Sequence, residues 1–308
     1  MGVLYVLGQL KNKTITAILI KNVNGETGMK YGRESLTSLQ LDALRRKKLF
    51  LFDMDGTLYL DNDLFDGTLD ILRHIRETGG KAVFVTNNSS KSVDGYVEKL
   101  TKLGISTTKD DFMTSAQATG FHLKKSHCGG EIYVFGTQAL FEMLRDEYDL
   151  PVTRKLEEGI TCLLIAYDTE LTFQKMEDAS RLLLGNPNLT YLATNPDMVC
   201  PRDFGYVPDC GALAQSLFYA TGRRPQVIGK PEPAMALLAM ERYGFAPEET
   251  VLLGDRVYTD IRCGISAGID SVLVLSGEST METVEEADVK PTMILRDVRE
   301  LYQIMTED

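Results

Sequence analysis

Three absences narrow what this chain of 308 residues can be. It contains no apolar run that approaches the length of a membrane span, so we expect no transmembrane helix. Basic residues are in the minority, with 33 Lys and Arg against 44 Asp and Glu. The net charge of −11 argues against a surface for nucleic acid or anionic membranes, because either partner would require a basic face.

Cysteine is also scarce, with five residues that are scattered and form no CxxC pair. This usage favours a reducing cytosol over a disulfide framework. The apolar residues 1–10 lack the basic segment that begins a signal peptide. The expected location is therefore cytoplasmic. The hydrophobic content of 44% is ordinary for a globular protein, and the length allows one large or two smaller domains.

From Leu49 onward, apolar runs alternate with segments of helical periodicity. The runs that predict strands are 49–52, 81–85, 132–135, 161–165, 190–193, 226–228, 250–253 and 271–275. This alternation predicts an α/β fold, with a doubly wound parallel sheet and helices on both of its faces. Before it, residues 1–34 predict a hairpin or a loose tail, and Thr37 with Gln40 predicts a capping box that opens a short helix.

The most informative residues are Asp53 and Asp55, in the stretch Asp-Met-Asp-Gly-Thr directly after the run 49–52. The carboxyl ends of parallel strands meet at the edge where α/β sheets bind ligands. Two acids at that edge can act separately as nucleophile and proton donor. Taken alone, the stretch is also compatible with an ordinary turn, because Asp and Gly favour turns.

Polar residues follow three further predicted strands. They are Thr86, Asn87 and Asn88 after 81–85, Lys230 after 226–228, and Asp255 and Asp260 after 250–253. Crowded aspartates repel each other, and a divalent cation with oxygen ligands relieves that repulsion. Mg²⁺ and Lys230 together would offset the carboxylates and a phosphate dianion, so the set suits phosphoryl transfer.

These motifs, in this order, resemble the four motifs of the haloacid dehalogenase (HAD) superfamily. The fuller strings at 86–89, 193–197, 210–213, 229–231 and 254–261 are similar to its NagD and p-nitrophenylphosphatase subgroup. The resemblance extends from about residue 45 to the C-terminus. It implies a Rossmann-like core with an inserted α/β cap of the C2 type, the arrangement named HAD-IIA.

The resemblance also implies a catalytic role for five residues. Asp53 would attack phosphorus and form an aspartyl-phosphate. Asp55 would protonate the leaving oxygen and then activate the hydrolytic water. Thr86 and the amide of Asn87 would hold the phosphoryl oxygens, and Lys230 would bridge the phosphate and the nucleophile.

The same resemblance implies a Mg²⁺ site. Its ligands would be Asp53, the backbone carbonyl of Asp55, and Asp255. Asp260 would support these ligands without binding the metal itself. Gly56 is expected to give the backbone room to turn beneath the phosphate.

The interval between Thr86 and Lys230 is far longer than a simple crossover needs, so it predicts an inserted domain. We expect an N-terminal extension at 1–44, a catalytic core at 45–128 and 207–308, and a cap at 129–206. The segment 195–209 is expected to fold back over the entrance. Candidate substrate contacts in and beside it are Asn195, Asp197 and Cys210.

The expected function is a Mg²⁺-dependent phosphatase for small phosphomonoesters, namely nucleoside monophosphates, sugar phosphates or aryl phosphates. A phosphotransferase or phosphomutase would keep the same motifs, and a pseudo-phosphatase would only bind a phosphorylated ligand. The expected partner is a small phosphorylated metabolite, without nucleic acid or membrane. Similar proteins often dimerise through the cap, which makes a homodimer possible.

Several residues outside the main motif positions have more than one interpretation. Arg256 could support the metal carboxylates or pair at the surface. His122, His127 and Cys128 suggest zinc, but no fourth ligand has a familiar spacing. The remaining candidates are expected to pack in the interior: Cys200, Met176, Met235 and Met240.

Overall fold

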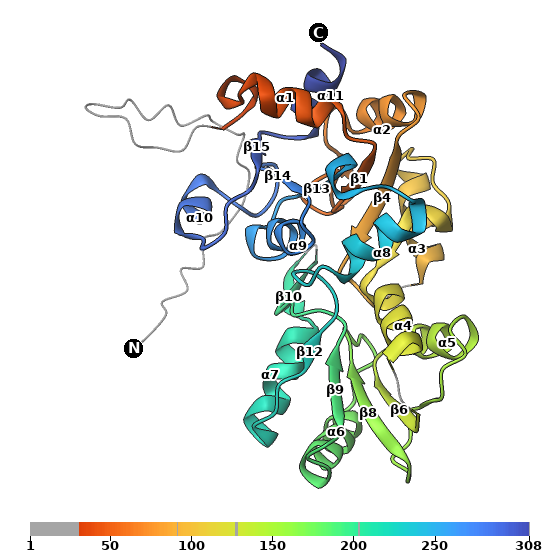
Figure 1. Ribbon diagram of the computed structural model, residues 1–308. Coiled ribbons are helices and arrows are strands. Elements are labelled where there is room, and N and C mark those ends of the chain that lie inside the picture. Colours follow the sequence, from red (N-terminus) through yellow and green to blue (C-terminus); the bar gives the residue numbers. More distant parts are fainter. Residues whose placement is uncertain (1–30, 91, 127–128, 203, 308) are drawn as a thin grey trace. The chain divides into compact units, whose positions relative to one another are not determined.

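The computed structural model describes residues 31–90, 92–126, 129–202 and 204–307 (Figure 1). The expected hairpin or tail at the N-terminus falls on residues 1–30 and so lies outside the described residues. Within the described ranges, no helix is both long and apolar enough to cross a membrane. The predicted capping box is confirmed, since Thr37 and Gln40 cap each other at the start of α1 (Ser38–Arg45).

A six-stranded sheet has the order β15-β14-β13-β1-β4-β5, and all of its neighbouring strands run parallel. Its strands are β1 (Leu49–Phe52), β4 (Lys81–Thr86), β5 (Phe112–Thr114), β13 (Thr250–Gly254), β14 (Asp270–Val274) and β15 (Met293–Leu295). The strand order reverses at β1, which lies between β4 and β13 (Figure 1). In open α/β sheets, ligands bind at such a reversal.

Helices cover both faces of this sheet because alternate residues of its strands point to opposite sides. Leu49 and Leu51 of β1 pack with α4 (Ser115–Ser126) and α8 (Ala234–Tyr243). Phe50 and Phe52 pack on the other face with α1 and with three further helices. These are α2 (Thr68–Glu77), α3 (Val93–Lys102) and α11 (Val298–Thr306). The predicted doubly wound fold is confirmed.

A second parallel sheet has five strands in the order β12-β9-β8-β6-β7. They are β6 (Glu131–Phe135), β7 (Val152–Thr153), β8 (Ile160–Ile165), β9 (Thr190–Ala193) and β12 (Gln226–Val227). Its helices are α5 (Gln138–Asp146), α6 (Phe173–Gly185) and α7 (Cys210–Thr221). The residues of α6 and α7 share one apolar cluster with β8 and β9.

The second sheet extends further along the chain than the sequence suggested. Its last strand, β12, ends at Val227, and α7 packs against β8 and β9 of the same sheet, whereas we expected the inserted domain to end at residue 206. We therefore propose that this domain runs from about residue 129 to about residue 228. Two small antiparallel ribbons complete the fold near the sheet edges: β2 (Tyr59–Leu60) with β3 (Asp63–Leu64), and β10 (Val199–Arg202) with β11 (Gly205–Pro208).

Candidate active site

A cavity of about 580 Å³ lies at the carboxyl ends of β1 and β4. Asp53, Asp55, Thr86, Asn87 and Lys230 all line it. These five residues come from three segments far apart in the sequence. The parallel topology brings Asp53, Asp55, Thr86 and Asn87 to one edge of the six-stranded sheet, as predicted, whereas Lys230 follows β12 of the second sheet and reaches this edge from there. Further lining residues come from the segment between β9 and α7, including Asp197, Val199, Cys200 and Asp209.

Lys230 is the electrostatic centre of this edge. Its Nζ lies 2.6 Å from Asp53 Oδ1 and 2.6 Å from Asp260 Oδ1, and it also donates to the carbonyl of Val85 at 3.3 Å. The Lys230 side chain is only 3% exposed. An ammonium so deeply buried needs this set of acceptors, because an unpaired buried charge is very costly.

The carboxylate of Asp255 occupies a space that is open only because residues 56 and 277 are glycines. Its Oδ2 accepts a hydrogen bond from the amide of Glu278 at 2.7 Å. A Cβ on Gly56 would lie 2.4 Å from that oxygen, and one on Gly277 would lie 2.1 Å from it. Gly56 also has a φ of 88°, which favours glycine. Gly56 therefore makes room for the Asp255 carboxylate, in addition to allowing the backbone turn that the sequence predicted.

The carboxylates fit a divalent cation. One oxygen from each of Asp53, Asp255 and Asp260 lies within 4.8 Å of the others. Asp260 uses both of its oxygens in hydrogen bonds, to Lys230 Nζ and to the amide of Arg256 at 3.1 Å. Asp255 Oδ1, by contrast, is buried and has no hydrogen-bond partner among the described residues. Asp255 and Asp53 are thus the better metal ligands, and Asp260 is better suited to holding Lys230.

The pKa values at this edge reflect an excess of negative charge. Burial raises the pKa of Asp53 well above its usual value; Lys230 opposes the rise, whereas Asp260 and Asp255 add to it. Burial and the neighbouring Asp260 raise the pKa of Asp255 to about 6. Burial alone would lower the pKa of Lys230, but Asp260 and Asp53 outweigh it and raise that pKa. Three carboxylates around one ammonium leave a place for a further cation.

Asp55 lies on the open side of the cavity, with its side chain 51% exposed. The hydroxyl of Tyr59 donates to its Oδ2 at 3.5 Å, and Lys99 Nζ lies 3.4 Å from its Oδ1. The ammonium of Lys99 also lies 4.0 Å from the centre of the Tyr59 ring, a cation–π contact. A carboxyl group in this position is accessible to a leaving group, as a proton donor must be.

We did not predict Lys99 as a site residue. It lies on α3 three residues after Tyr96, which also lines the cavity, so one face of this helix carries both side chains to the site. That spacing was visible in the sequence. Nothing in the sequence showed, however, which face of α3 the site would use.

The segment at the end of β4 also lines the cavity. The hydroxyl of Thr86 accepts from the amide of Asn88 at 3.2 Å, which makes a tight turn at the strand end. The side chain of Asn87 points away from open solvent and is bonded to Asp197 and to the carbonyl of Lys230. Its Nδ2 is therefore occupied within the protein, whereas its Oδ1 is buried without a hydrogen-bond partner among the described residues. Phosphate binding by the backbone amide of Asn87 stays a prediction.

The three candidate substrate contacts from the inserted segment differ in their positions. Asp197 lines the cavity and is 9% exposed. Asn195 and Cys210 are each 0% exposed and do not line it. The Sγ of Cys210 faces the carbonyl of Ile165 at 3.5 Å. A direct substrate contact is therefore not supported for Asn195 or Cys210, because both are enclosed by the second sheet and its connections.

The structure also bears on the remaining sequence interpretations, which concern Arg256, the suggested zinc residues and the residues expected to pack in the interior. The Nε of Arg256 pairs with Glu278 at 2.8 Å, while its backbone amide supports Asp260. Of the suggested zinc residues, His127 and Cys128 lie outside the described residues. Met235 and Met240 of α8 are buried against one face of the six-stranded sheet, and Cys200 and Met176 pack with the second sheet, as predicted.

Comparison with known proteins connects this geometry to enzymes. A family model described as haloacid dehalogenase-like hydrolase matches residues 50–148, and a HAD-hydrolase-like model matches residues 227–301. An acid sugar phosphatase of Staphylococcus aureus is 33% identical over 258 residues, which cover 83% of this chain and 97% of that protein.

Solved structures agree with this. A 4-nitrophenylphosphatase from Thermotoga maritima superposes with a TM-score of 0.79 at 35% identity, covering 85% of this chain and 99% of that one. A glycerol phosphate phosphatase from Mycobacterium tuberculosis, solved in complex with magnesium, has a TM-score of 0.79 at 29% identity. That match covers 85% of this chain and 78% of the other.

Proposed function

The chain belongs to the haloacid dehalogenase-like hydrolases, in the NagD and p-nitrophenylphosphatase group, and is a phosphatase; we propose that it hydrolyses small phosphomonoesters with the help of Mg²⁺ through an aspartyl-phosphate on Asp53. The observation that carries this proposal is the position of Lys230. Its ammonium lies 2.6 Å from the carboxylate of Asp53 in a buried setting at the cavity wall.

In the first step, one oxygen of Asp53 attacks phosphorus while the bond from phosphorus to the leaving oxygen breaks. Asp55 donates its proton to that oxygen, so the product leaves as an alcohol. Lys230 and the amide of Asn87 stabilise the charge on the transferring phosphoryl group. Tyr59 and Lys99 hold the carboxyl group of Asp55 toward the open side of the cavity.

In the second step, Asp55 is a carboxylate and takes a proton from a water molecule. The resulting hydroxide attacks phosphorus, the bond to Asp53 breaks, and inorganic phosphate is released. Asp55 is suited to both steps because it is exposed to the cavity, whereas Asp53 and Asp260 are held by Lys230.

Mg²⁺ would be held by Asp53, by Asp255 through its unpartnered Oδ1, and by the backbone carbonyl of Asp55. When bound, it supplies positive charge that lets an anionic nucleophile approach an anionic phosphoryl group. The raised pKa values of Asp53 and Asp255 support the need for such a cation.

We propose sugar phosphates and glycerol phosphates as the substrate class. Three of the similar proteins are named for a sugar phosphate, a glycerol phosphate and 4-nitrophenyl phosphate. Among the described lining residues, Tyr96 is the single aromatic side chain, and it is only 4% exposed. The cavity therefore offers little surface on which a nucleobase could stack, while Asp61, Asn62 and Asn88 offer hydrogen bonds to hydroxyl groups.

The test is release of phosphate from p-nitrophenyl phosphate and from a panel of sugar, glycerol and nucleoside phosphates, with and without Mg²⁺. We expect activity only with the metal and none above background for Asp53→Asn. Asp178→Asn is the matched control, because Asp178 is a buried carboxylate bonded to Tyr133 and Gln174, away from the cavity. Equal turnover by wild type and Asp53→Asn would refute the mechanism.

The same assay separates the alternatives. Transfer of the phosphoryl group to an added sugar, in place of release as inorganic phosphate, would indicate a phosphotransferase. Phosphate binding without turnover would indicate a pseudo-phosphatase. A cytoplasmic location and a homodimer through the inserted domain remain predictions, for which cell fractionation and sedimentation are the measurements.

A further inference from the structure

The loop at residues 86–90 belongs to the core by sequence, yet it is bonded to the inserted domain at several points. We propose that the inserted domain fixes the shape of this phosphate loop, and that Asp197 is the positioning residue that does so through Asn87. The proposal rests on the function above, because it assigns the loop to phosphate binding. It adds that the inserted domain contributes to the phosphate site itself as well as covering it.

Asp197 makes the central contact. Its Oδ2 accepts a hydrogen bond from Asn87 Nδ2 at 3.0 Å and another from Asn195 Nδ2 at 3.2 Å. Asn87 Nδ2 also donates to the carbonyl of Lys230 at 2.9 Å. One amide group of the loop thus joins the inserted domain to the backbone of the lysine that holds the nucleophile.

Asp197 is itself held in place by Asn195 and by the first turn of α7. Asn195 Nδ2 donates to Asp209 Oδ1 at 3.2 Å, and Asp209 caps the N-terminus of α7. The amide of Gly211 donates to the carbonyl of Asp197 at 2.8 Å. A Cβ on Gly211 would lie 2.1 Å from the carbonyl oxygen of Pro196, so α7 packs directly against this backbone. The first turn of α7 therefore fixes where Asp197 can lie.

This chain of contacts is almost entirely removed from water. Asn195 is 0% exposed, Asp209 3%, Asn87 7% and Asp197 9%. A hydrogen bond to a buried carboxylate is among the stronger ones, and removing its partner leaves a desolvated group unsatisfied. The loop cannot readily change its shape while these bonds are intact.

Three further contacts anchor the end of the loop. The hydroxyl of Ser89 bonds with that of Thr194 at 2.9 Å and accepts from the amide of Tyr167 at 3.2 Å. The hydroxyl of Thr137 donates to the carbonyl of Ser90 at 3.4 Å. All three partners follow strands of the second sheet, so the loop lies against the carboxyl edge of that sheet.

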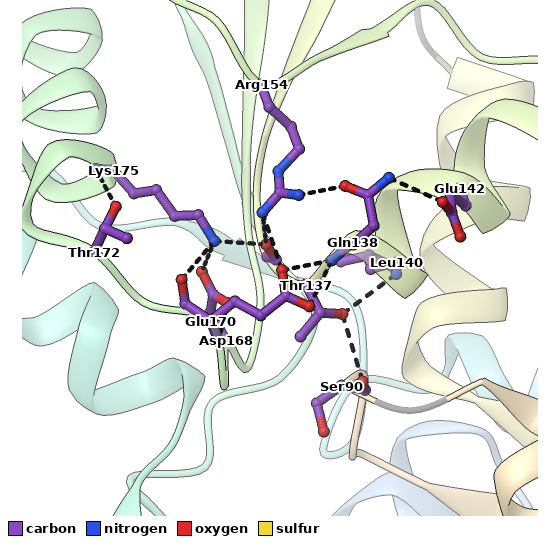
Figure 2. Close-up of polar contacts among 11 residues, drawn as sticks. Ser90, Thr137, Gln138, Leu140, Glu142, Arg154, Asp168, Glu170, Thr172 and Lys175 are labelled. Atoms are coloured by element: carbon purple, nitrogen blue, oxygen red, sulfur yellow. Dashed lines mark hydrogen bonds and ion pairs between the residues drawn. The ribbon is translucent and has the colours of Figure 1, made fainter.

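That edge is itself rigidly cross-linked, as Figure 2 shows. Lys175 pairs with the buried Asp168 at 2.6 Å and donates to the carbonyl of Gly136. Glu170 accepts from Arg154 and from the amide of Gln138, which opens α5 beside Thr137. A network of this kind gives the loop a fixed surface to bond to.

The test compares Asp197→Ala, Asp197→Asn and the control Asp178→Asn with the wild type. Hydrogen–deuterium exchange of residues 84–90 reports loop order without any need for activity. Titration calorimetry with inorganic phosphate and Mg²⁺ gives the phosphate Kd. For Asp197→Ala we expect loop exchange faster by about tenfold and a Kd weaker by about tenfold. Asp197→Asn keeps an oxygen acceptor and should restore most of both, and Asp178→Asn should change neither.

The proposal is overturned if Asp197→Ala leaves exchange and Kd within about twofold of wild type, or if Asp178→Asn loosens the loop equally. Should Asp197→Ala not fold, Ser89→Ala removes a second anchor of the same loop and must increase loop exchange instead. Absence of phosphate binding by the wild type would refute the proposed function, and would leave the loop-exchange result as the separate test of Asp197.

Discussion

Asp255→Asn should make the metal-free protein more stable while abolishing its activity. Asp255 is buried, and its Oδ1 has no hydrogen-bond partner among the described residues. One of its carboxylate oxygens lies within 4.8 Å of an oxygen of Asp53 and one of Asp260. Its pKa rises to about 6 from the usual 3.8. That difference corresponds to about 3 kcal/mol at neutral pH, by which ionised Asp255 destabilises the folded state without metal.

The sign follows from proton binding. Because the folded state holds its proton more tightly than the unfolded state, the destabilisation is absent below about pH 4. It develops as the pH rises toward about 6. The stability of the metal-free wild type should therefore fall across this range, and Asp53, whose pKa is also raised, should contribute in the same direction. Bound Mg²⁺ removes the penalty by supplying the missing positive charge.

Asparagine has nearly the same shape and carries no charge. Its oxygen can keep the hydrogen bond from the amide of Glu278, and its amide can donate toward Asp53 or Asp260. We expect the metal-free variant to gain about 1–3 kcal/mol at pH 7, and its loss of stability between pH 4 and 6 to be shallower. Mg²⁺ should no longer raise its free energy of unfolding, and turnover should be lost.

The assay is urea unfolding followed by far-UV circular dichroism, since the chain has no tryptophan to report on. It is run with chelator and with Mg²⁺ from pH 4 to pH 8. The reasoning is refuted if the metal-free variant is less stable than the wild type at pH 7, or if Mg²⁺ stabilises both equally. Asp178→Asn, outside the site, should retain the wild-type response to Mg²⁺.

Three further predictions concern other parts of the site. Gly56→Ala should lower the free energy of unfolding by about 2 kcal/mol or more and remove the Mg²⁺-dependent rise in Tm, because its Cβ would lie 2.4 Å from Asp255 Oδ2. Lys99→Met should reduce kcat by about tenfold because Asp55 loses its cationic neighbour, and Lys99→Arg should recover much of it in steady-state assays. Cys210→Ala should lower the free energy of unfolding by about 1 kcal/mol, measured by thermal or urea unfolding, without changing KM. A changed KM would instead support a substrate contact by Cys210, which its burial argues against.

The sequence predicted the parts of this fold that local patterns encode. The eight apolar runs each correspond to a strand, because runs of buried residues between turn-forming segments are typical of parallel sheets. Strands β5, β7 and β15 were not predicted. Each has only two or three residues, so pairing with a neighbour defines it and no periodicity can. The ribbon of β10 and β11 contains Pro201 and Pro208, which argue against strands in a sequence.

The residues of the site likewise fall into those that local sequence patterns predict and those that they do not. Asp53 and Asp255 follow β1 and β13, and Thr86 ends β4, so the rule for parallel sheets places these three together. Lys230 follows β12 of the second sheet, so that rule does not account for its position beside Asp53. The bond between Asn87 and Asp197 joins residues 110 positions apart, and the one between Asp55 and Lys99 joins residues 44 apart. Such pairs arise from how helices and the inserted domain pack against the sheet, and no local pattern contains that information.

The charge balance of the cavity explains why a chain of net charge −11 can bind a phosphate ester at all. Lys230 is already shared by Asp53 and Asp260, and Arg256 is paired with Glu278. Lys99 lies beside Asp55. Among the described lining residues, each cation is thus matched by at least one carboxylate, which leaves no surplus positive charge there for a phosphate dianion. We therefore expect metal and phosphate to bind with positive coupling, each raising the affinity for the other, because the charge that one brings is the charge the other lacks.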